Sequence, residues 1–371
     1  MMHLGLDAKR LLFNRSGLGN YARSTVRALA LHAPELQMTL FSPRNKADWM
    51  EDVCLKGFDS SDHFKNATLY HPSHAMPWWR SFGMGKAAAA QGVEVFHGLS
   101  NEIPFDLPST IRKVCTIHDL IFIDQPNHYP WFDRQVYLKK VNHALKHSDA
   151  IIATSEATRD RILFHFPNTQ APIHVVYQPI HPIFKSARSA PSNNPPYFIY
   201  HSGFNQRKNH LRLLEAYESV MHNIQQHLVL IGVKGDTYEQ VNAFIQRSHL
   251  KNRVQIMTEV GNKELAHWLH HAEGFIYPSI TEGFGIPLAE AAACGLRVAV
   301  SNIPVFRELS QGGMIMFDPL DTSSIANAIM SLAKHDPDQE LKQVGSRNQI
   351  LDRINDQNIA HQLLHIYSKP S

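Results

Sequence analysis

Residues 277–297 read Tyr-Pro-Ser-Ile-Thr-Glu-Gly-Phe-Gly-Ile-Pro-Leu-Ala-Glu-Ala-Ala-Ala-Cys-Gly-Leu-Arg and say more about the fold than any other stretch of the chain. The apolar run at 274–277 is typical of a short buried strand. Pro287 suits the first turn of a helix, where its missing N–H costs no hydrogen bond, and Gly295 suits the end of that helix. The stretch therefore predicts a strand, a glycine-containing turn and a helix.

Two carboxylates occupy this turn and helix, with seven residues between them. We expect Glu290 in the first turn of the helix and Glu282 on the loop before it. Gly283 and Gly285 would let a ligand approach the backbone closely, and the free N–H groups at the start of a helix attract a phosphate. Carboxylates would repel that phosphate but would accept hydrogen bonds from a neighbouring sugar. A nucleotide sugar, a diphosphate with sugars at both ends, fits this pattern; the alternative is two exposed glutamates that only favour the start of a helix.

The same stretch resembles the Glu-x7-Glu motif of retaining glycosyltransferases of family 4, and the resemblance extends over nearly the whole chain. It implies that Glu282 contacts the transferred sugar and that Glu290 binds the ribose of the nucleotide. The turn between them, Gly283, Phe284 and Gly285, would line the donor site. The resemblance also implies an α/β chain of the GT-B fold, in which two Rossmann-like domains face a deep interdomain cleft.

The bulk composition is that of an ordinary folded protein, with 371 residues, 43% hydrophobic and 19% charged. A net charge of +3 is too small to indicate nucleic-acid binding. Three distant cysteines, Cys54, Cys115 and Cys294, suit a reducing compartment and favour neither a disulfide framework nor a zinc cluster. The chain starts without a leader-like segment and has no apolar run of transmembrane length. We therefore expect a cytoplasmic protein that could still touch the inner face of a membrane.

Short apolar runs alternate with amphipathic segments, which predicts parallel sheets covered by helices on both faces. The expected strands are 3–6, 38–41, 93–96, 114–117, 150–153 and 174–176 in the first half and 198–201, 228–231, 254–256, 275–277, 298–300 and 314–317 in the second. A stretch rich in Pro, Ser and Asn at 186–196 predicts a linker between the two sets. We expect an N-terminal acceptor-side domain at 1–185 and a C-terminal nucleotide-sugar-binding domain at 186–350. A helix at 351–371 would cross back onto the first domain, as in enzymes of the GT-B fold.

Ligands of open parallel sheets bind beyond the carboxyl ends of the strands. The strand at 198–201 is followed by Gly203 and then by two cations, Arg207 and Lys208, before a helix. This turn suits a diphosphate whose charge grows as its bond to the sugar breaks. It resembles the Arg-Lys-Asn segment of family 4, which implies that Lys208, with Arg207, holds the donor phosphates. Several members have Gly-Arg where this chain has Gly203-Phe204, so the two cations must supply more of the stabilisation; two solvated loop cations are the alternative.

The resemblance implies two further segments of the donor site. Glu259 and Val260, after the strand at 254–256, would read the nucleobase largely through backbone groups, which leaves the base open. Gly17 and Gly19 open a helix and resemble the N-terminal glycine loop of the family, although a tight turn is equally consistent with a lone Gly-x-Gly. The absence of Gly-x-Gly-x-x-Gly argues against a dinucleotide dehydrogenase.

The pair His118-Asp119 follows the strand at 114–117 and resembles the His-Asp segment of family 4, in which the histidine lies near the transferred sugar. We expect His118 to position the sugar or the acceptor from the first domain. The alternative is a structural histidine whose hydrogen bonds are satisfied within the protein.

An aromatic and basic cluster, Trp78-Trp79-Arg80 with Lys86 nearby, could meet a lipid headgroup or a lipid-linked acceptor. The alternative is that the two tryptophans pack against the rest of their domain.

Together with the resemblance, these observations lead us to expect a transferase that moves a hexose, with mannose as the first expectation, from a nucleoside-diphosphate sugar to a glycan or lipid-linked acceptor. The resemblance implies that the enzyme retains anomeric configuration and acts in surface polysaccharide synthesis. The expected catalytic residues are His118, Arg207, Lys208 and Glu282. The departing phosphate would take the acceptor's proton. Since no Asp-x-Asp lies beside these segments, we expect no metal and no other cofactor, and no nucleic-acid partner. Two alternatives stay open: an inactive nucleotide-sugar-binding or assembly protein of the same fold, and an enzyme that epimerises a sugar nucleotide without an acceptor.

Overall fold

The apolar runs of the sequence form two parallel sheets, each in its own unit of the chain. The computed structural model describes residues 2–14, 17–46, 61–74, 76–186, 194–334 and 336–368. One unit comprises Met1–Ile180 and Arg353–Ser371, and the other comprises His181–Asp352. The linker expected at 186–196 lies mostly outside the described residues.

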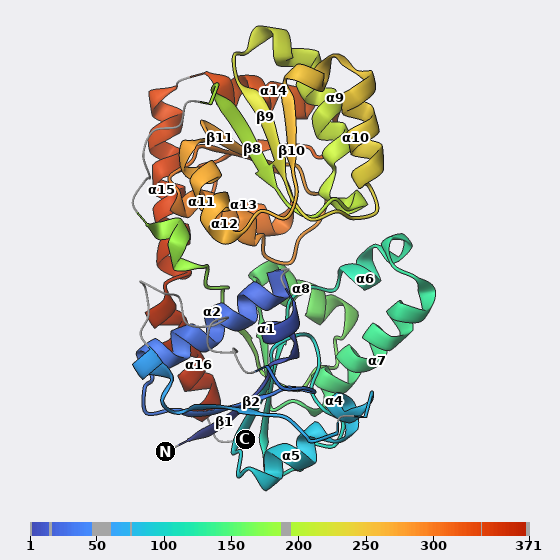
Figure 1. Cartoon of the computed structure of the whole chain (residues 1–371), viewed down its shortest axis with the longest axis vertical. Helices are drawn as coiled ribbons and strands as arrows, with labels where there is room; N and C mark the ends of the chain where they lie inside the picture. The colour runs from blue at the N-terminus through green and yellow to red at the C-terminus, as the bar shows by residue number, and fades with distance from the viewer. Residues whose placement is uncertain are drawn as a thin grey trace. The chain divides into compact units, whose positions relative to one another are not determined.

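Seven parallel strands within the described residues form the sheet of the N-terminal unit, in the order β3-β2-β1-β4-β5-β6-β7 (Figure 1). Their bounds are β1 His3–Asp7, β2 Gln37–Phe41, β3 Ala67–Tyr70, β4 Val95–Gly98, β5 Arg112–Ile117, β6 Ala150–Ala153 and β7 Ile173–Val175. The central strands β1, β4 and β6 are buried along their whole length, which explains their nearly continuous apolar sequences. The sequence did not predict β3, because this short edge strand is buried at only one of its four residues and has a weak apolar pattern.

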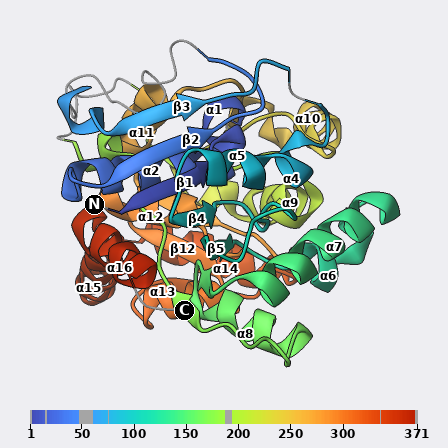
Figure 2. The same ribbon diagram turned by 90° about the horizontal axis from the view of Figure 1, so that it is seen from below.

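Helices cover this sheet, and the last helix of the chain is one of them. Their bounds are α1 Lys9–Phe13, α2 Gly17–His32, α4 Trp79–Phe82, α5 Met84–Ala90, α6 Ile121–Asp124, α7 Trp131–His147, α8 Glu156–His165 and α16 Asp356–Ser368. α16 packs against α2 and buries Leu363 and Ile366 in the core that contains β1 and β2 (Figure 2). The buried guanidinium of Arg27 on α2 donates to Asp356 Oδ2 at 2.7 Å. The helix that ends the described chain is therefore part of the N-terminal unit.

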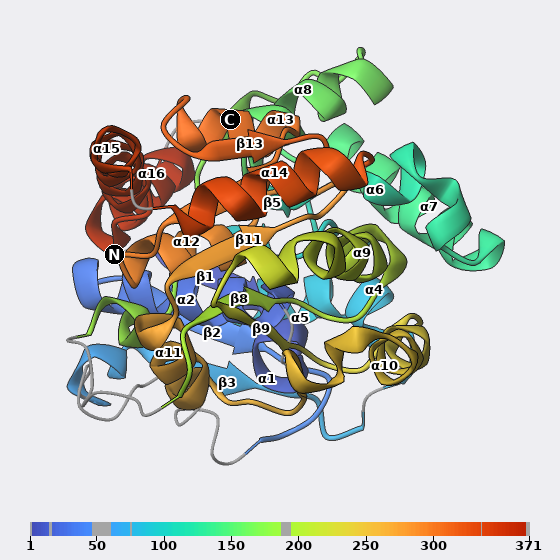
Figure 3. The ribbon, with the colours of Figure 1, turned by 90° about the horizontal axis from the view of Figure 1, so that it is seen from above.

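The C-terminal unit has a sheet of six parallel strands among its described residues, in the order β10-β9-β8-β11-β12-β13. The strands are β8 Tyr197–His201, β9 His227–Ile231, β10 Val254–Met257, β11 Gly274–Tyr277, β12 Val298–Ser301 and β13 Ile315–Phe317. The helices are α9 His210–Val220, α10 Tyr238–Arg247, α11 Asn262–His271, α12 Ile286–Ala293, α13 Pro304–Ser310, α14 Thr322–Ala333 and α15 Pro337–Arg353. α9 and α14 lie side by side on this sheet (Figure 3).

Both sheets show the Rossmann-like order in which the chain builds outward from a central strand, returns, and builds outward on the other side. The prediction of two such α/β domains is confirmed. Each expected strand has a counterpart whose ends differ from the expected ones by no more than two residues. No helix within the described ranges combines the length and apolarity that a bilayer span requires.

Candidate active site

The strand order of the C-terminal unit creates a switch point between β8 and β11. From β8 the chain moves outward to β9 and β10 and then returns, so that β11 pairs with the other side of β8. The loops that follow β8 and β11 therefore leave the sheet in opposite directions, and open α/β sheets bind their ligands at such a point. Residues 202–209 and 278–285 make up these two loops.

Glu282 forms the centre of an ion cluster that joins the two loops. Its Oε1 accepts hydrogen bonds from Lys208 Nζ and from the hydroxyl of Tyr277, the latter at 3.0 Å. Its Oε2 accepts a bond of 3.1 Å from Arg207 Nη1, which also donates to the backbone oxygen of Thr281 at 3.2 Å. The side chains of Glu282 and Lys208 are only 8% and 10% exposed. The structure thus brings together three residues that the sequence predicts for the site.

The electrostatics of this cluster combine two cations with one buried carboxylate. Burial alone would raise the pKa of Glu282, but the charges of Lys208 and Arg207 and a hydrogen bond from Lys208 lower it to about 2. The carboxylate is therefore ionised at neutral pH and pairs with both cations. Burial raises the pKa of Tyr277, so its hydroxyl keeps its proton and donates it to Glu282. Two cations beside a carboxylate suit a phosphate next to a hydroxyl-bearing sugar.

Backbone conformation fixes the position of Lys208. The 3-10 turn that carries Lys208 ends at Asn209, whose φ of 63° lies in the left-handed region that asparagine tolerates. The Asn209 amide donates to the backbone oxygens of Pro278 at 3.0 Å and Pro319 at 2.7 Å, and the Tyr200 hydroxyl donates to the backbone oxygen of Lys208 at 3.0 Å. The loops are therefore held together behind the cations. Neither Asn209 nor Tyr200 is among the predicted site residues. The position of Asn209 between two cations and a helix could have indicated its role from the sequence.

The Gly203-Phe204 pair contributes no cation to this loop. Phe204 is fully buried and stacks on His210, with ring centroids 4.5 Å apart and an interplanar angle of 25°. Its ring therefore belongs to the core of the unit. Arg207 and Lys208 are the cationic groups that this loop can offer to a ligand.

Glu290 lies in the second turn of α12, so the expectation that it lies in the first turn is wrong. Gly285 has a φ of 95° and ends the loop, the helix begins at Ile286, and Pro287 occupies the first turn. The Glu290 side chain is 6% exposed, and its Oε2 lies 3.1 Å from Nε2 of His201 at the end of β8. Glu290 and Glu282 are both buried, and both have ion-pair partners. The alternative of two exposed glutamates therefore does not hold.

The turn between the two glutamates is shaped by packing. It consists of Gly283, Phe284 and Gly285, and the phenyl ring of Phe284 is buried. A Cβ atom on Gly285 would lie 2.6 Å from Cε1 of Phe306, in addition to the strain of the positive φ. Only glycine fits this last position without moving its neighbours.

Glu259 and Val260 stand apart from the ion cluster. They follow β10, which is separated from β8 by β9 in the sheet. Glu259 has a φ of 62° and is exposed, and Val260 is half-buried. Contact of these two residues with a nucleobase stays a prediction.

In the N-terminal unit, Gly17 and Gly19 lie in the first turn of α2, where the sequence predicts a helix start. A Cβ atom on Gly19 would lie 1.8 Å from the backbone oxygen of Asn14. The close approach of these two backbones explains why glycine occupies position 19. A role of this turn toward a ligand stays a prediction.

His118 follows β5 directly and is bonded at its own backbone as well as at its ring. Its N–H donates to Asn101 Oδ1 at 2.7 Å, and its carbonyl accepts from the hydroxyls of Thr154 at 3.0 Å and Thr158 at 3.2 Å. The ring of Tyr21 meets the imidazole edge-on, with centroids 4.6 Å apart. Burial lowers the pKa of His118 to about 4, so the imidazole is uncharged at neutral pH.

An ion network that the sequence did not predict lies at the switch point of the N-terminal unit, where β1 and β4 are neighbours. Arg80 Nε donates to Oδ2 of Asp7 at 2.7 Å, and another guanidinium nitrogen pairs with Glu102. Lys140 Nζ lies 2.7 Å from the second oxygen of Glu102. Arg80 is thus an internal ion-pair partner, 12% exposed, and the expectation that it meets a lipid headgroup is wrong. The position of Asp7 at the end of an apolar run is the signal that could have found this network.

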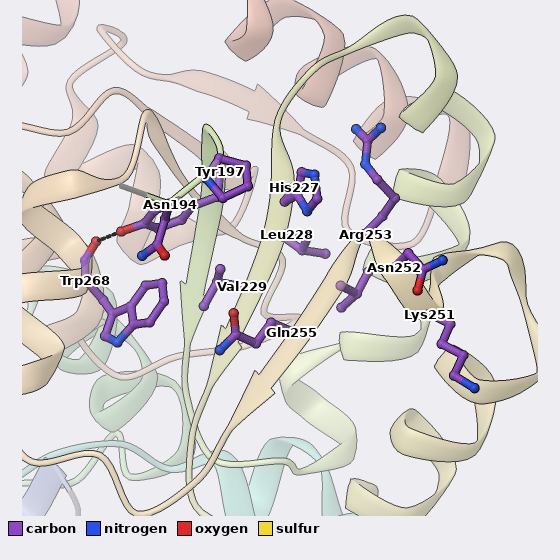
Figure 4. A pocket seen from close by; sticks show the side chains of 12 residues that line it. Asn194, Tyr197, His227, Leu228, Val229, Lys251, Asn252, Arg253, Gln255 and Trp268 are labelled. Atoms are coloured by element: carbon purple, nitrogen blue, oxygen red, sulfur yellow. Dashed lines mark hydrogen bonds between the residues drawn. The ribbon is translucent and has the colours of Figure 1, made fainter. Parts of the chain in front are cut away.

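A cavity of about 320 Å³ lies at the other end of the strands of the C-terminal unit, beside the first residues of β8, β9 and β10 (Figure 4). Tyr197 and Trp268 contribute aromatic rings to it, and the Tyr197 hydroxyl donates to the backbone oxygen of Trp268 at 2.7 Å. The predicted site residues follow the carboxyl ends of their strands, so none of them lines this cavity.

Comparisons with known proteins agree with this architecture. A model described as Glycosyltransferase Family 4 matches residues 15–183, and one described as Glycosyl transferases group 1 matches residues 183–349. The chain is 27% identical to the O-antigen chain mannosyltransferase B of Escherichia coli over 262 residues, which is 67% of each chain. It is 26% identical to the O-antigen chain mannosyltransferase RfbU of Salmonella typhimurium over 228 residues, 61% of this chain and 62% of that one. The alignments thus span about two thirds or less of these relatives.

A solved structure of HepE from Anabaena, in complex with UDP and glucose, has a TM-score of 0.75 and covers 99% of both chains at 15% identity, a likeness of fold. The two Rossmann-like units and the family matches together define a glycosyltransferase with the GT-B fold. Between them the two family models extend from residue 15 to residue 349 without a gap. The chain belongs to the family 4-like glycosyltransferases, which confirms the resemblance seen in the Glu-x7-Glu segment.

Proposed function

We propose that this glycosyltransferase retains anomeric configuration and moves a hexose, mannose in the first instance, from a nucleoside-diphosphate sugar to a hydroxyl of a glycan or lipid-linked acceptor. The observation that carries the donor side of the proposal is the ion cluster of Arg207, Lys208 and Glu282 at the switch point of the C-terminal unit. The names of the two O-antigen mannosyltransferases favour mannose and a role in surface polysaccharide synthesis.

In the proposed reaction, the bond between C1 of the sugar and the diphosphate breaks while a bond forms between C1 and the acceptor oxygen. Negative charge grows on the departing phosphate, where Arg207 and Lys208 would stabilise it. Glu282 would accept hydrogen bonds from the sugar, and Glu290 would accept them from the ribose. The acceptor's proton would pass to the departing phosphate, so the proposal needs no general base from the protein. That no metal or other cofactor is required is part of the proposal.

The names of different relatives bear on the nucleotide and on the sugar of the proposed donor. HepE is described with UDP and glucose, and the two curated relatives are described as mannosyltransferases. The base would contact residues after β10, such as Glu259 and Val260, through their backbones, which does not discriminate between bases. The donor therefore has to be identified by binding.

A panel of GDP-, UDP- and ADP-sugars should raise the melting temperature of the protein with one nucleotide class only. A ligand that binds the folded state alone must raise apparent stability. The rise should disappear in Lys208→Ala and in Glu290→Ala, because each variant removes a charge from the proposed site. Lys263→Ala, an exposed lysine at the start of α11, is the matched control and should keep the full rise. The measurement is thermal unfolding followed by fluorescence.

The same panel separates the proposal from its rivals. A well-folded protein that no donor stabilises would contradict the donor site and favour a degenerate member of the fold. Stabilisation without turnover, with purified glycan acceptors present, would favour a protein that binds or assembles without catalysis. Conversion of the donor into another sugar nucleotide in the absence of acceptor would identify an epimerase. An inverted anomeric centre in the product would refute retention.

Contact with a membrane is the remaining part of the proposal, and exposed aromatic rings of the N-terminal unit support it. Trp79 stacks on Tyr70, with ring centroids 6.4 Å apart, and Arg80 is held by carboxylates. Trp78 remains 56% exposed and Phe82 remains 55% exposed. The packing alternative is therefore correct for one of the two tryptophans and not for the other.

The exposed rings beside α4 adjoin α7. Phe82 stacks on Phe105, with centroids 5.1 Å apart, and Phe105 stacks on His143 of α7 at 4.1 Å. The first turn of α7 exposes Trp131 at 68% and Phe132 at 71%. One exposed aromatic group therefore lies at α4, which Phe105 connects to the second half of α7, and the other lies in the first turn of α7. We propose that these rings make the membrane contact.

An anionic bilayer is the occupant that the charge of α7 favours. The helix carries four Lys and Arg residues against one Asp, and Lys139 and Lys146 are exposed on it. The double variant Trp131→Ala, Phe132→Ala should bind vesicles that contain phosphatidylglycerol at least about tenfold more weakly, since burying one large apolar side chain is worth about 1.5–3 kcal/mol. Leu341→Ala, 72% exposed in the C-terminal unit, should bind like the unaltered protein.

Vesicle sedimentation checks this expectation. Equal binding to purely zwitterionic vesicles would contradict the charge argument. Absence of binding to either kind of vesicle, or an exposed aromatic surface that is instead covered in a dimer detected by light scattering, would remove the membrane from the proposal.

A further inference from the structure

The two ring nitrogens of His118 both have partners inside the N-terminal unit. Nε2 lies 2.8 Å from the backbone oxygen of Leu99, and Nδ1 lies 3.0 Å from the amide nitrogen of Gln178. Gln178 and His118 are 4% and 5% exposed, so water does not compete for these bonds. A sugar hydroxyl could bond to either nitrogen only if one of these partners moved away.

The chemistry of the two partners assigns the protons of the ring. A backbone carbonyl can only accept, so Nε2 must carry a hydrogen. An amide nitrogen can only donate, so Nδ1 must be without one. The opposite orientation of the Gln178 amide would place an oxygen against Nδ1 and would require a second proton on the ring. Burial opposes that second proton because it opposes the charge.

The other groups around the imidazole do not favour a charge either. The titratable groups that face it are Tyr21 of α2, Arg10 of α1 and His97 of β4, and Asp119 is its neighbour in the chain. Arg10 disfavours a further positive charge. Burial raises the pKa of Tyr21 to about 12, so its hydroxyl is uncharged at neutral pH.

We propose that Gln178 is a positioning residue that holds His118 in one uncharged tautomer, with its hydrogen on Nε2, and thereby excludes His118 from proton transfer. The role of His118 is then to hold the backbone after β5 against Leu99, Asn101 and the start of α8. The inference rests on the proposed transferase function only for its kinetic test.

Substitution of Gln178 by glutamate should make the charge of His118 depend on pH within a measurable range. A carboxylate facing Nδ1 would bind a second ring proton and raise the pKa of His118. Below the raised pKa the imidazole would be charged, and above it the imidazole would be uncharged as in the unaltered protein. If the reaction needs the uncharged form, kcat of Gln178→Glu should fall about tenfold for each unit of pH below that pKa, while KM for the donor changes little. Gln178→Met keeps the shape without a charge and should show the pH profile of the unaltered protein.

The test that does not depend on turnover is long-range nitrogen–proton NMR of the histidine rings, with the His118 signal assigned by comparison with Gln178→Met. The unaltered protein should show an uncharged His118 with its hydrogen on Nε2 between about pH 5 and pH 8. Gln178→Glu should show a doubly protonated ring at the lower end of that range. Gln135→Glu adds the same charge on the exposed face of α7 and should leave both the signal and the pH profile unchanged.

Three results would overturn the inference. They are a hydrogen on Nδ1 in the unaltered protein, a charged imidazole at neutral pH, and a Gln178→Glu variant that folds and shows no second ring proton at the lower end of that pH range. If Gln178→Glu does not fold, the spectrum of the unaltered protein still decides the tautomer. A correct tautomer in a protein that transfers no sugar would contradict the proposed function and leave the role of Gln178 in fixing the tautomer standing.

Discussion

Replacement of Lys208 by alanine should lower the rate of sugar transfer by about 10³-fold, since one preorganised group that meets developing charge is worth a factor of about 10²–10³. Lys208 is 8% exposed as a residue, and Asn209 and Tyr200 fix the backbone that carries it. The ammonium is therefore already in place before a donor binds. Without it, Arg207 would be the one cation of this loop left beside Glu282, and the growing charge of the phosphate would lose its ammonium partner.

A double variant distinguishes loss of charge from loss of folding. Removal of one partner from a buried ion pair leaves the other partially unpaired and costs about 3–5 kcal/mol when nothing replaces it. Arg207 and Tyr277 still contact Glu282, so the loss of stability in Lys208→Ala should be at the low end of that range. Adding Glu282→Gln should restore part of the melting temperature but none of the transfer rate. Steady-state kinetics and thermal unfolding check this, and full transfer activity in Lys208→Ala would contradict the phosphate role.

The sheet architecture could be predicted from sequence because parallel strands buried on both faces are continuous apolar runs, and such runs are visible without a structure. β6 and β12 are examples, each with all four residues buried. The edge strand β3 could not be predicted in this way, because its sequence Ala-Thr-Leu-Tyr has no continuous apolar pattern. The start of α12 was predicted from its proline, but the turn that holds Glu290 was not. That position depends on where the positive φ of Gly285 ends the loop.

In the candidate site too, the positions of residues after strands could be predicted from the sequence, but their tertiary contacts could not. Arg207, Lys208 and Glu282 could be predicted because each follows the carboxyl end of a strand, and strand ends can be located from the apolar pattern. The partners of these residues could not be predicted. Lys208 Nζ reaches Glu282 only because β8 ends beside β11, which is a property of the strand order.

In the N-terminal unit, the partners of His118 were likewise not predictable from the sequence. The sequence predicts His118 correctly as a polar residue at the end of a strand, but it contains no sign that Leu99 and Gln178, 19 and 60 residues away in the chain, take both ring nitrogens. The choice between a ligand-binding and a satisfied histidine therefore depended on tertiary contacts. These contacts favour a structural histidine whose hydrogen bonds are satisfied within the protein. Gln178 supplies one of those bonds.

Replacement of Gly285 by alanine should weaken donor binding by about 10–100-fold and lower the melting temperature. The φ of 95° at this position disfavours any side chain, with a strain of about 1–3 kcal/mol. The new Cβ atom would also lie 2.6 Å from Cε1 of Phe306, so that ring must move. Phe306 packs on Tyr277, with ring centroids 4.7 Å apart, and Tyr277 donates to Glu282. A shift of Phe306 would thus displace Tyr277, and with it the carboxylate of Glu282 to which Tyr277 donates.

Gly295→Ala separates the two causes. Gly295 has a comparable φ of 77°, but a Cβ atom there would meet nothing within 4 Å. This variant should therefore lose stability from backbone strain alone and should bind the donor normally, whereas Gly285→Ala should lose both. Gly261→Ala, with neither a positive φ nor a neighbour within 4 Å, should change neither quantity. Donor titration by calorimetry and thermal unfolding provide the comparison. Normal donor affinity in Gly285→Ala would mean that Tyr277 tolerates a displaced Phe306, so the orientation of Glu282 would then depend on Lys208 and Arg207 alone.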